Sequence, residues 1–117
     1  MSTASSHAFR TRTNAITQEI LKFLFSKGIF AWRQNVVAPF DPKLGQHRAS
    51  SKKGVSDILA VVPPNGKFLA IEIKVGKDRM RPEQVGFMES IHFVGGCHMV
   101  VHNFEDFKDQ FKFSDLL

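Results

Sequence analysis

Cysteine is almost absent from this 117-residue sequence, which contains only Cys97. A single thiol excludes an internal disulfide and a multi-cysteine zinc site. No apolar run approaches the roughly 20 residues that a membrane-spanning helix needs. The opening stretch MSTASSHAFRTRTN also lacks the apolar core of a secretory signal peptide. We therefore expect a cytoplasmic protein in a reducing compartment, with no membrane partner.

Acidic residues are the minority among the charged side chains, and tyrosine is missing altogether. Sixteen Lys and Arg face eleven Asp and Glu, which gives a net charge of +5 and a pI near 9.7. A basic surface attracts polyanions, and nucleic acids are the common polyanions of a cell. Hydrophobic residues make up 43% of the chain, enough for the core of one domain. We expect a flexible basic arm over residues 1–13 and a single domain over residues 14–117.

Hydrophobic periodicity predicts a chain of helices and strands. A helical stripe ends at Gly28, and the turn sequence Pro63-Pro64-Asn65-Gly66 separates two strands in a manner typical of a hairpin. The predicted helix, three strands, helix, strand and helix cover residues 14–27, 29–38, 56–62, 67–75, 82–94, 97–102 and 103–117. We expect the α/β class, with a small mixed sheet flanked by helices. The Phe-rich last helix either docks on this sheet or forms an interface with a second chain.

Three charged side chains interrupt the hairpin strands. Asp57 begins the run DILAVV, and Glu72 and Lys74 stand within FLAIEIKV. A strand this apolar is typically buried on both faces, where a charge is costly unless a partner or a metal ion compensates it. Because side chains alternate along a strand, Glu72 and Lys74 project from the same face. The apolar flanks favour a buried site over the alternative, a salt bridge on an exposed sheet face.

The turn decides whether Asp57 joins the other two side chains. A four-residue loop over residues 63–66 places Asp57 opposite Glu72, and a two-residue Asn65-Gly66 turn places it opposite Lys74. A three-residue loop would direct Asp57 to the other face of the sheet. Two of these registers unite the three side chains, and the sequence leaves the choice open.

Two carboxylates followed by a lysine suit phosphodiester hydrolysis. Asp57 and Glu72 offer the hard oxygen ligands that Mg²⁺ or Mn²⁺ prefers, with the Ile73 carbonyl as a third. Such an ion polarises the phosphoryl oxygen and lowers the pKa of a bound water. Lys74, on the same face, would orient the attacking water and stabilise the transition state. The pattern predicts a metal-dependent nuclease.

The same residues carry a family resemblance. The motif Gly54-Val55-Ser56-Asp57, fourteen intervening residues and Glu72-Ile73-Lys74 resembles the PD-(D/E)xK nuclease superfamily, and within it the VRR-NUC (virus-type replication-repair nuclease) domains. The likeness continues through Gly76-Lys77-Asp78, Gln84, Gly95-Gly96 and the strand Met99-Val100-Val101. It implies a restriction-endonuclease-like core and Mg²⁺-dependent endonuclease activity on DNA.

The resemblance also implies two further site residues and a mode of action. Gln84 matches a glutamine that would hold a metal-bound water or a phosphate, and Glu19 matches an acidic residue that first helices of such nucleases bring to the metal. Ser56 departs from the family, since many relatives have proline before the aspartate. Small relatives of this kind often act as homodimers on branched DNA such as four-way junctions, so we expect DNA and a second copy of the chain as partners.

Basic residues lie on both sides of the motif. Arg48, Lys52 and Lys53 precede Asp57, and a second set follows Lys74, comprising Lys77, Arg79 and Arg81. We expect both sets to contact the DNA backbone. Two other hypotheses are a non-catalytic nucleic-acid-binding module with a nuclease-like fold and a protein-interaction domain with a basic surface.

Two histidines, His98 and His102, have the spacing of a metal-binding pair on a helix. They lie on a predicted strand, where residues four apart are separated by roughly 13 Å. We therefore expect them to have structural or surface roles.

Overall fold

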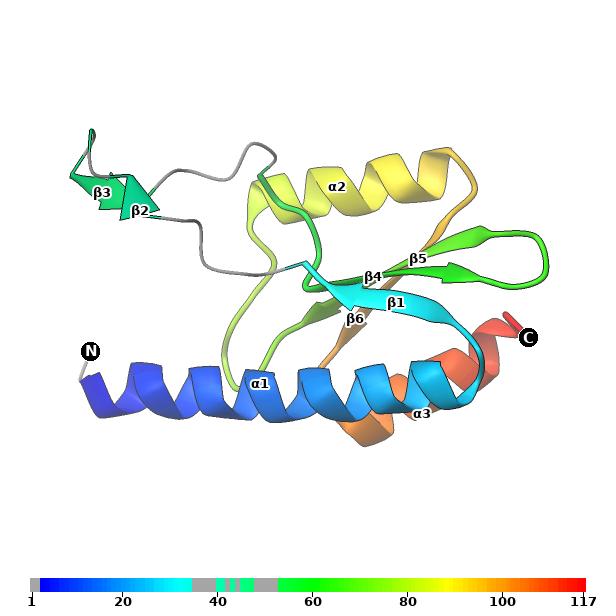
Figure 1. Cartoon of the computed structure of the whole chain (residues 1–117), viewed down its shortest axis with the longest axis horizontal. Helices are drawn as coiled ribbons and strands as arrows, with labels where there is room; N and C mark the ends of the chain where they lie inside the picture. Colours follow the sequence, from blue (N-terminus) through cyan, green and yellow to red (C-terminus); the bar gives the residue numbers. More distant parts are fainter. Residues whose placement is uncertain (1–2, 35–39, 42, 44, 48–52) are drawn as a thin grey trace.

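The computed structural model of the chain describes residues 3–34, 40–41, 43, 45–47 and 53–117. Within these residues, helices cover both faces of a four-stranded sheet (Figure 1). The elements are α1 (Thr3–Ser26), β1 (Phe30–Arg33), β2 (Phe40–Asp41), β3 (Gln46–His47), β4 (Ile58–Val62), β5 (Lys67–Ile73), α2 (Pro82–Phe93), β6 (Cys97–Val101) and α3 (Phe104–Ser114). The predicted α/β class, with a mixed sheet flanked by helices, is confirmed.

The sheet has the strand order β1-β4-β5-β6. β4 pairs antiparallel with β1 and with β5, whereas β5 and β6 are parallel. Parallel neighbours need a crossover connection, and α2 provides it on one face of the sheet. α1 and α3 lie on the other face (Figure 1). The site described below forms on the α2 side.

The hairpin adopts the register of the four-residue loop. Val62 pairs with Lys67, Ile58 pairs with Ile71, and the Gly66 N–H donates to the Val62 carbonyl at 2.9 Å. Gly66 has a φ of 75°, a conformation that glycine adopts without steric cost. Continuing the register by one pair beyond Ile58 places Asp57 opposite Glu72. The first of the two registers that unite the charged side chains is therefore the one adopted.

The hydrophobic core fills the space between the sheet and the α1/α3 layer. Its fully buried members include Ile20, Leu24, Ile58, Leu69, Ile71, Val101 and Phe107. Phe23 of α1 packs edge-to-face against Phe107 and Phe111 of α3, with ring centroids 5.4 and 5.3 Å apart. Of the two alternatives for the Phe-rich tail, docking on its own core is confirmed.

Several boundaries differ from the predictions. α1 begins at Thr3, so residues 3–13 are helical and not the flexible arm that we expected. No proline or glycine interrupts residues 3–27, and the Thr17 hydroxyl donates to the Thr13 carbonyl at 2.8 Å across the expected boundary. The first predicted strand ends at Arg33, and residues 35–39 lie outside the described residues. The short pair β2–β3 lies in the connection over residues 39–55, for which no strand was predicted.

In the part of the chain that the structure describes, no helix combines the length and the apolar character needed to cross a membrane.

Candidate active site

Three polar side chains are buried on the α2 face of the sheet. Glu72, Lys74 and Gln84 are only 3%, 4% and 5% exposed. Glu72 belongs to β5, whose alternate residues Leu69, Ile71 and Ile73 face the core. The alternation of side chains along β5 therefore sends Glu72 and Lys74 toward α2, which carries Gln84. Glu72 and Lys74 therefore project from the same face of the sheet, as predicted.

The side chain of Asp57 is held against β5 by a hydrogen bond from the backbone of that strand. One of its carboxylate oxygens, Oδ2, accepts a hydrogen bond from the Ile73 N–H at 2.7 Å. Asp57 stands directly before β4, so its side chain replaces the backbone acceptor that the strand no longer supplies. This bond keeps a second carboxylate beside Glu72 and makes the register of the hairpin chemically important.

The nearby carboxylate of Asp57 affects the pKa of Glu72. Burial, followed by the negative charge of Asp57, raises the pKa of Glu72 to about 8. Lys74 and Arg81 act in the opposite direction, but their positive charges do not offset these two causes. Glu72 Oε2 is buried and has no hydrogen-bond partner among the described residues. Without a bound cation the folded protein therefore favours the protonated form of Glu72, and an ionised Glu72 would have a buried oxygen without a donor beside a second carboxylate.

Gln84 connects Glu72 to the first turn of α2. The Arg81 N–H donates to Gln84 Oε1 at 2.8 Å, so the amide nitrogen Nε2 is left to donate to Glu72 Oε1 at 3.3 Å. Pro82, at the first position of α2, has the φ angle that a helix start requires. Both ends of the Gln84 amide are engaged within the protein. The contact that the structure describes is thus with a proposed metal ligand, Glu72.

Lys74 lies between two carboxylates. Its Nζ is 3.9 Å from Glu72 Oε1 and 3.6 Å from Asp78 Oδ2. No role was predicted for Asp78, although its carboxylate lies four residues after Lys74 in the sequence. His102, for which a structural or surface role was expected, donates from Nδ1 to the Lys74 carbonyl at 2.8 Å. This second contact had no signal in the sequence, because only the pairing of β5 with β6 brings the two residues together.

A further contact supports the residue before Asp57. The fully buried Ser56 hydroxyl lies 3.0 Å from His98 Nε2. Burial, followed by the positive charge of His92, lowers the pKa of His98 to about 4, so this imidazole is neutral at neutral pH. His98 and His102 therefore hydrogen-bond to different residues, Ser56 and Lys74, which agrees with the structural roles expected of them.

The donor set suits a hard divalent cation. Asp57 and Glu72 supply carboxylate oxygens, and Glu72 Oε2 is a buried acceptor without a donor. Among the described residues there is no group of three or more His, Cys, Asp or Glu side chains arranged to hold a metal ion. Mg²⁺, however, keeps several waters and is commonly bound through one or two carboxylates. The residues present therefore fit such an ion.

The remaining predicted residues lie away from this cluster or outside the described residues. Glu19 is exposed on α1 and makes no hydrogen bond or ion pair with the cluster, so it is not retained as a ligand. Four predicted DNA-contacting residues are exposed: Lys53, Lys77, Arg79 and Arg81. Arg81 lies close enough to lower the pKa of Glu72. Arg48 and Lys52 lie outside the described residues.

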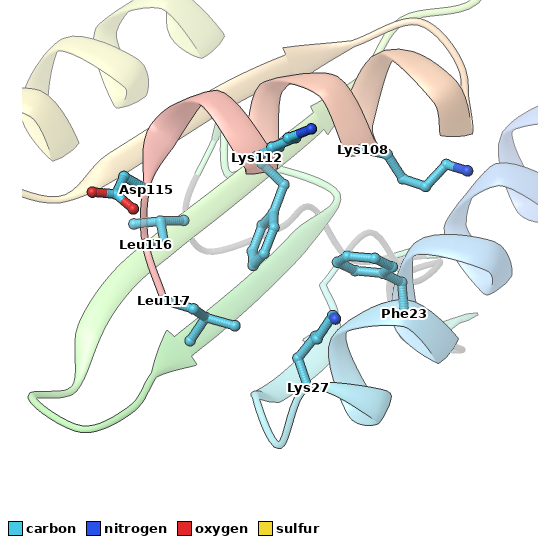
Figure 2. Close-up of a pocket in the computed structure, with 8 residues that line it drawn as sticks. Phe23, Lys27, Lys108, Lys112, Asp115, Leu116 and Leu117 are labelled. Atoms are coloured by element: carbon cyan, nitrogen blue, oxygen red, sulfur yellow. The ribbon is translucent and has the colours of Figure 1, made fainter.

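A hollow of about 410 Å³ between α1 and α3 is separate from the candidate site (Figure 2). Its lining residues are Phe23, Lys27, Lys108, Phe111, Lys112, Asp115, Leu116 and Leu117. Two of its cations already have partners, since Lys27 Nζ lies 5.4 Å from the centre of the Phe23 ring and Lys108 Nζ lies 3.0 Å from Glu105 Oε1. This hollow contains none of the cluster residues and adds nothing to their chemistry.

Comparison of the chain with protein-family models, with curated proteins and with solved structures found no match in any of the three.

Proposed function

We propose that this chain is a metal-dependent endonuclease that hydrolyses DNA phosphodiester bonds. The observation that carries the proposal is the buried carboxyl group of Glu72, which has an unpartnered oxygen and lies beside Asp57 and Lys74. An ionised, buried Glu72 next to the half-buried carboxylate of Asp57 is costly for the fold. A divalent cation would offset that cost, and phosphoryl transfer is a reaction that such an ion assists.

The resemblance to PD-(D/E)xK nucleases, and to VRR-NUC domains among them, supports the same proposal. The fold order α1-β1-β4-β5-α2-β6 is compatible with a restriction-endonuclease-like core. Asp57 lies directly before one hairpin strand and Glu72 lies in the next, an arrangement compatible with the motif. These two observations are independent of the electrostatic argument, since they concern topology and register.

Asp57 and Glu72 would hold Mg²⁺ or Mn²⁺, together with the Ile73 carbonyl. A strand residue directs its N–H and its carbonyl toward the same neighbouring strand, and the Ile73 N–H faces Asp57. The bound ion would supply Lewis-acid polarisation of the phosphate and a more acidic water. Gln84 orients Glu72 through its amide. Lys74 orients the attacking water and stabilises the negative charge that develops on the phosphate.

DNA would reach the site along a basic margin, which we define as the four exposed cations Lys53, Lys77, Arg79 and Arg81. Lys77, Arg79 and Arg81 lie between Lys74 and α2, and Lys53 lies on the Asp57 side. Their exposed cations suit contacts to phosphates rather than to base edges. We further propose that the chain acts as a homodimer with a preference for branched DNA such as four-way junctions, as the resemblance implies.

The test is cleavage of linear, flapped and four-way DNA side by side, with Mg²⁺ and with Mn²⁺. We expect cleavage that EDTA abolishes and that Lys74→Ala reduces by at least about 100-fold, because one charge-stabilising group is lost. Lys67→Ala, an exposed lysine at the start of β5, is the matched control and should retain activity.

Binding measured with Ca²⁺ in place of Mg²⁺ separates the alternatives. Tight binding of DNA without cleavage under any of these conditions would favour the non-catalytic nucleic-acid-binding module. Negligible binding at physiological salt would favour a protein-interaction domain. Equal cleavage by the parent and by Lys74→Ala would refute the proposed site.

A further inference from the structure

Both polar backbone atoms of Lys74 form hydrogen bonds, one with Val101 at the end of β6 and one with His102, the next residue. The Lys74 N–H donates to the Val101 carbonyl at 2.9 Å, and the Lys74 carbonyl accepts from His102 Nδ1 at 2.8 Å. In a continuing parallel ladder, this carbonyl would accept from the backbone of residue 103. The chain turns into α3 at Asn103 instead. The imidazole of His102 thus supplies the donor that the ladder lacks.

This contact defines the tautomer of His102. A carbonyl oxygen can only accept a hydrogen bond, so Nδ1 must carry the hydrogen. The ring is therefore fixed in position and in protonation pattern by the backbone of the lysine. A histidine that only covered the surface could adopt either tautomer.

Helix α3 in turn holds His102. The His102 N–H donates to Asp106 Oδ2 at 2.9 Å, and the other oxygen of Asp106 accepts from Gln110 Nε2 at 3.1 Å. The same Gln110 nitrogen donates to the Val100 carbonyl at 2.8 Å, which ties α3 to β6 directly. Hydrogen bonds therefore run without interruption from α3 through His102 to Lys74.

We propose that His102 and Asp106 are positioning residues for Lys74, so that α3 controls the geometry of the site although it contributes no side chain to it. The inference rests on the proposed nuclease function. Lys74 Nζ has two competing carboxylates, those of Glu72 and Asp78, so a small movement of its backbone changes which of them it approaches. A misplacement of about 1 Å can cost about 100-fold in rate.

The kinetic test compares three substitutions of His102 in the full chain. His102→Ala removes the donor. His102→Asn keeps an N–H donor the same number of bonds from the backbone as Nδ1, whereas His102→Gln places it one bond further. We expect kcat to fall about 10-fold or more in the Ala and Gln variants with KM unchanged, and the Asn variant to recover to within about 3-fold of the parent.

Two substitutions in α3 complete the comparison. Asp106→Ala should lower kcat in the same direction as His102→Ala. Asp109→Ala removes an exposed carboxylate from the same helix and should leave kcat unchanged. Unfolding midpoints measured in parallel identify any general loss of stability. Equal kcat for His102→Ala and the parent, or an Asn variant no better than the Ala variant, would overturn the proposal.

The tautomer gives a readout that does not depend on nuclease activity. Nitrogen-15 chemical shifts of the imidazole in the unmodified chain should show hydrogen on Nδ1 of His102. Hydrogen on Nε2 instead would overturn the inference whether or not the chain cleaves DNA. A chain that cleaves no DNA but shows the Nδ1–H tautomer would refute the proposed function, and with it the catalytic consequence, while the link between His102 and Lys74 would stand.

Discussion

At the scale of single residues, Glu72 couples the stability of the fold to pH. Burial and the charge of Asp57 raise its pKa to about 8, from an ordinary value of 4.5. Between these values the carboxyl group is protonated in the folded protein and ionised in the unfolded chain, so unfolding releases a proton. The contribution of Glu72 to the stability of the metal-free protein is therefore complete below about pH 4.5 and is lost as the pH rises through about 8.

Replacing Glu72 with glutamine tests this coupling. In Glu72→Gln we expect the loss of stability between pH 5 and pH 8 to become smaller, and the free energy of unfolding at pH 8 to rise by roughly 1–3 kcal/mol, because a neutral amide replaces a buried carboxylate. Urea unfolding in EDTA at pH 5, 7 and 8 measures both quantities. The variant should also lose nuclease activity.

Glu89→Gln is the control, since Glu89 is exposed on the same helix that carries Gln84. Its pH dependence should match that of the parent. Mg²⁺ should raise the unfolding midpoint of the parent at pH 8 and not that of Glu72→Gln, because the ion binds only the folded, ionised site. An unchanged pH profile in Glu72→Gln would show that Glu72 is not the group responsible.

At the scale of elements, two glycines test how α2 is placed over the sheet. Gly54 has a φ of 81°, and an added Cβ would lie 2.1 Å from the Glu83 carbonyl oxygen in the first turn of α2. Gly86 lies within α2, and a Cβ there would meet nothing within 4 Å. The segment leading to Asp57 thus packs directly on the helix start, whereas the middle of the helix has room.

We expect opposite effects of alanine at these two positions. Gly54→Ala should lower the free energy of unfolding by about 2–4 kcal/mol, through backbone strain and displacement of the α2 start, and should reduce cleavage because Asp57 is only three residues away. Gly86→Ala should raise the free energy of unfolding by about 0.5–1 kcal/mol, since alanine is the better helix former. Thermal unfolding of both variants measures this, and a Gly54→Ala variant as stable as Gly86→Ala would contradict the packing.

The elements show which predictions local sequence could support. Gly28 ends α1 with a φ of 73°, Pro82 begins α2, and Gly66 closes the hairpin, all as predicted from turn and capping chemistry. The predicted start of α1 at residue 14 was wrong, because residues 3–13 have no periodic apolar face that would indicate a helix. The β2–β3 pair was missed for a similar reason, since strands of two residues carry no alternation that could be recognised.

At the scale of the whole molecule, the net charge of +5 should govern affinity for DNA. Four exposed cations flank the site, namely Lys53, Lys77, Arg79 and Arg81. If all four contact phosphates, the affinity measured in Ca²⁺ should fall about 100-fold between 50 and 200 mM salt. Fluorescence anisotropy with a labelled duplex measures this dependence.

The double variant Lys77→Ala, Arg79→Ala should reduce the slope of log affinity against log salt by roughly 2. Substituting two lysines on the far helices, Lys22→Ala with Lys112→Ala, removes the same net charge and should leave the slope nearly unchanged. Equal effects of the two pairs would mean that DNA does not follow the proposed margin.

The amino-acid sequence by itself determined the class of fold, the position of the hairpin and the identity of the three charged side chains, because each follows from local patterns of charge, alternation and turn residues. Only the tertiary structure decided that Asp57 lies opposite Glu72, that Gln84 orients Glu72, and that Glu19 does not join them. It also joined Lys74 to His102, which are 28 residues apart. These outcomes depend on the pairing of strands and the docking of helices, and no local pattern encodes the distance between residues that meet only when the sheet forms.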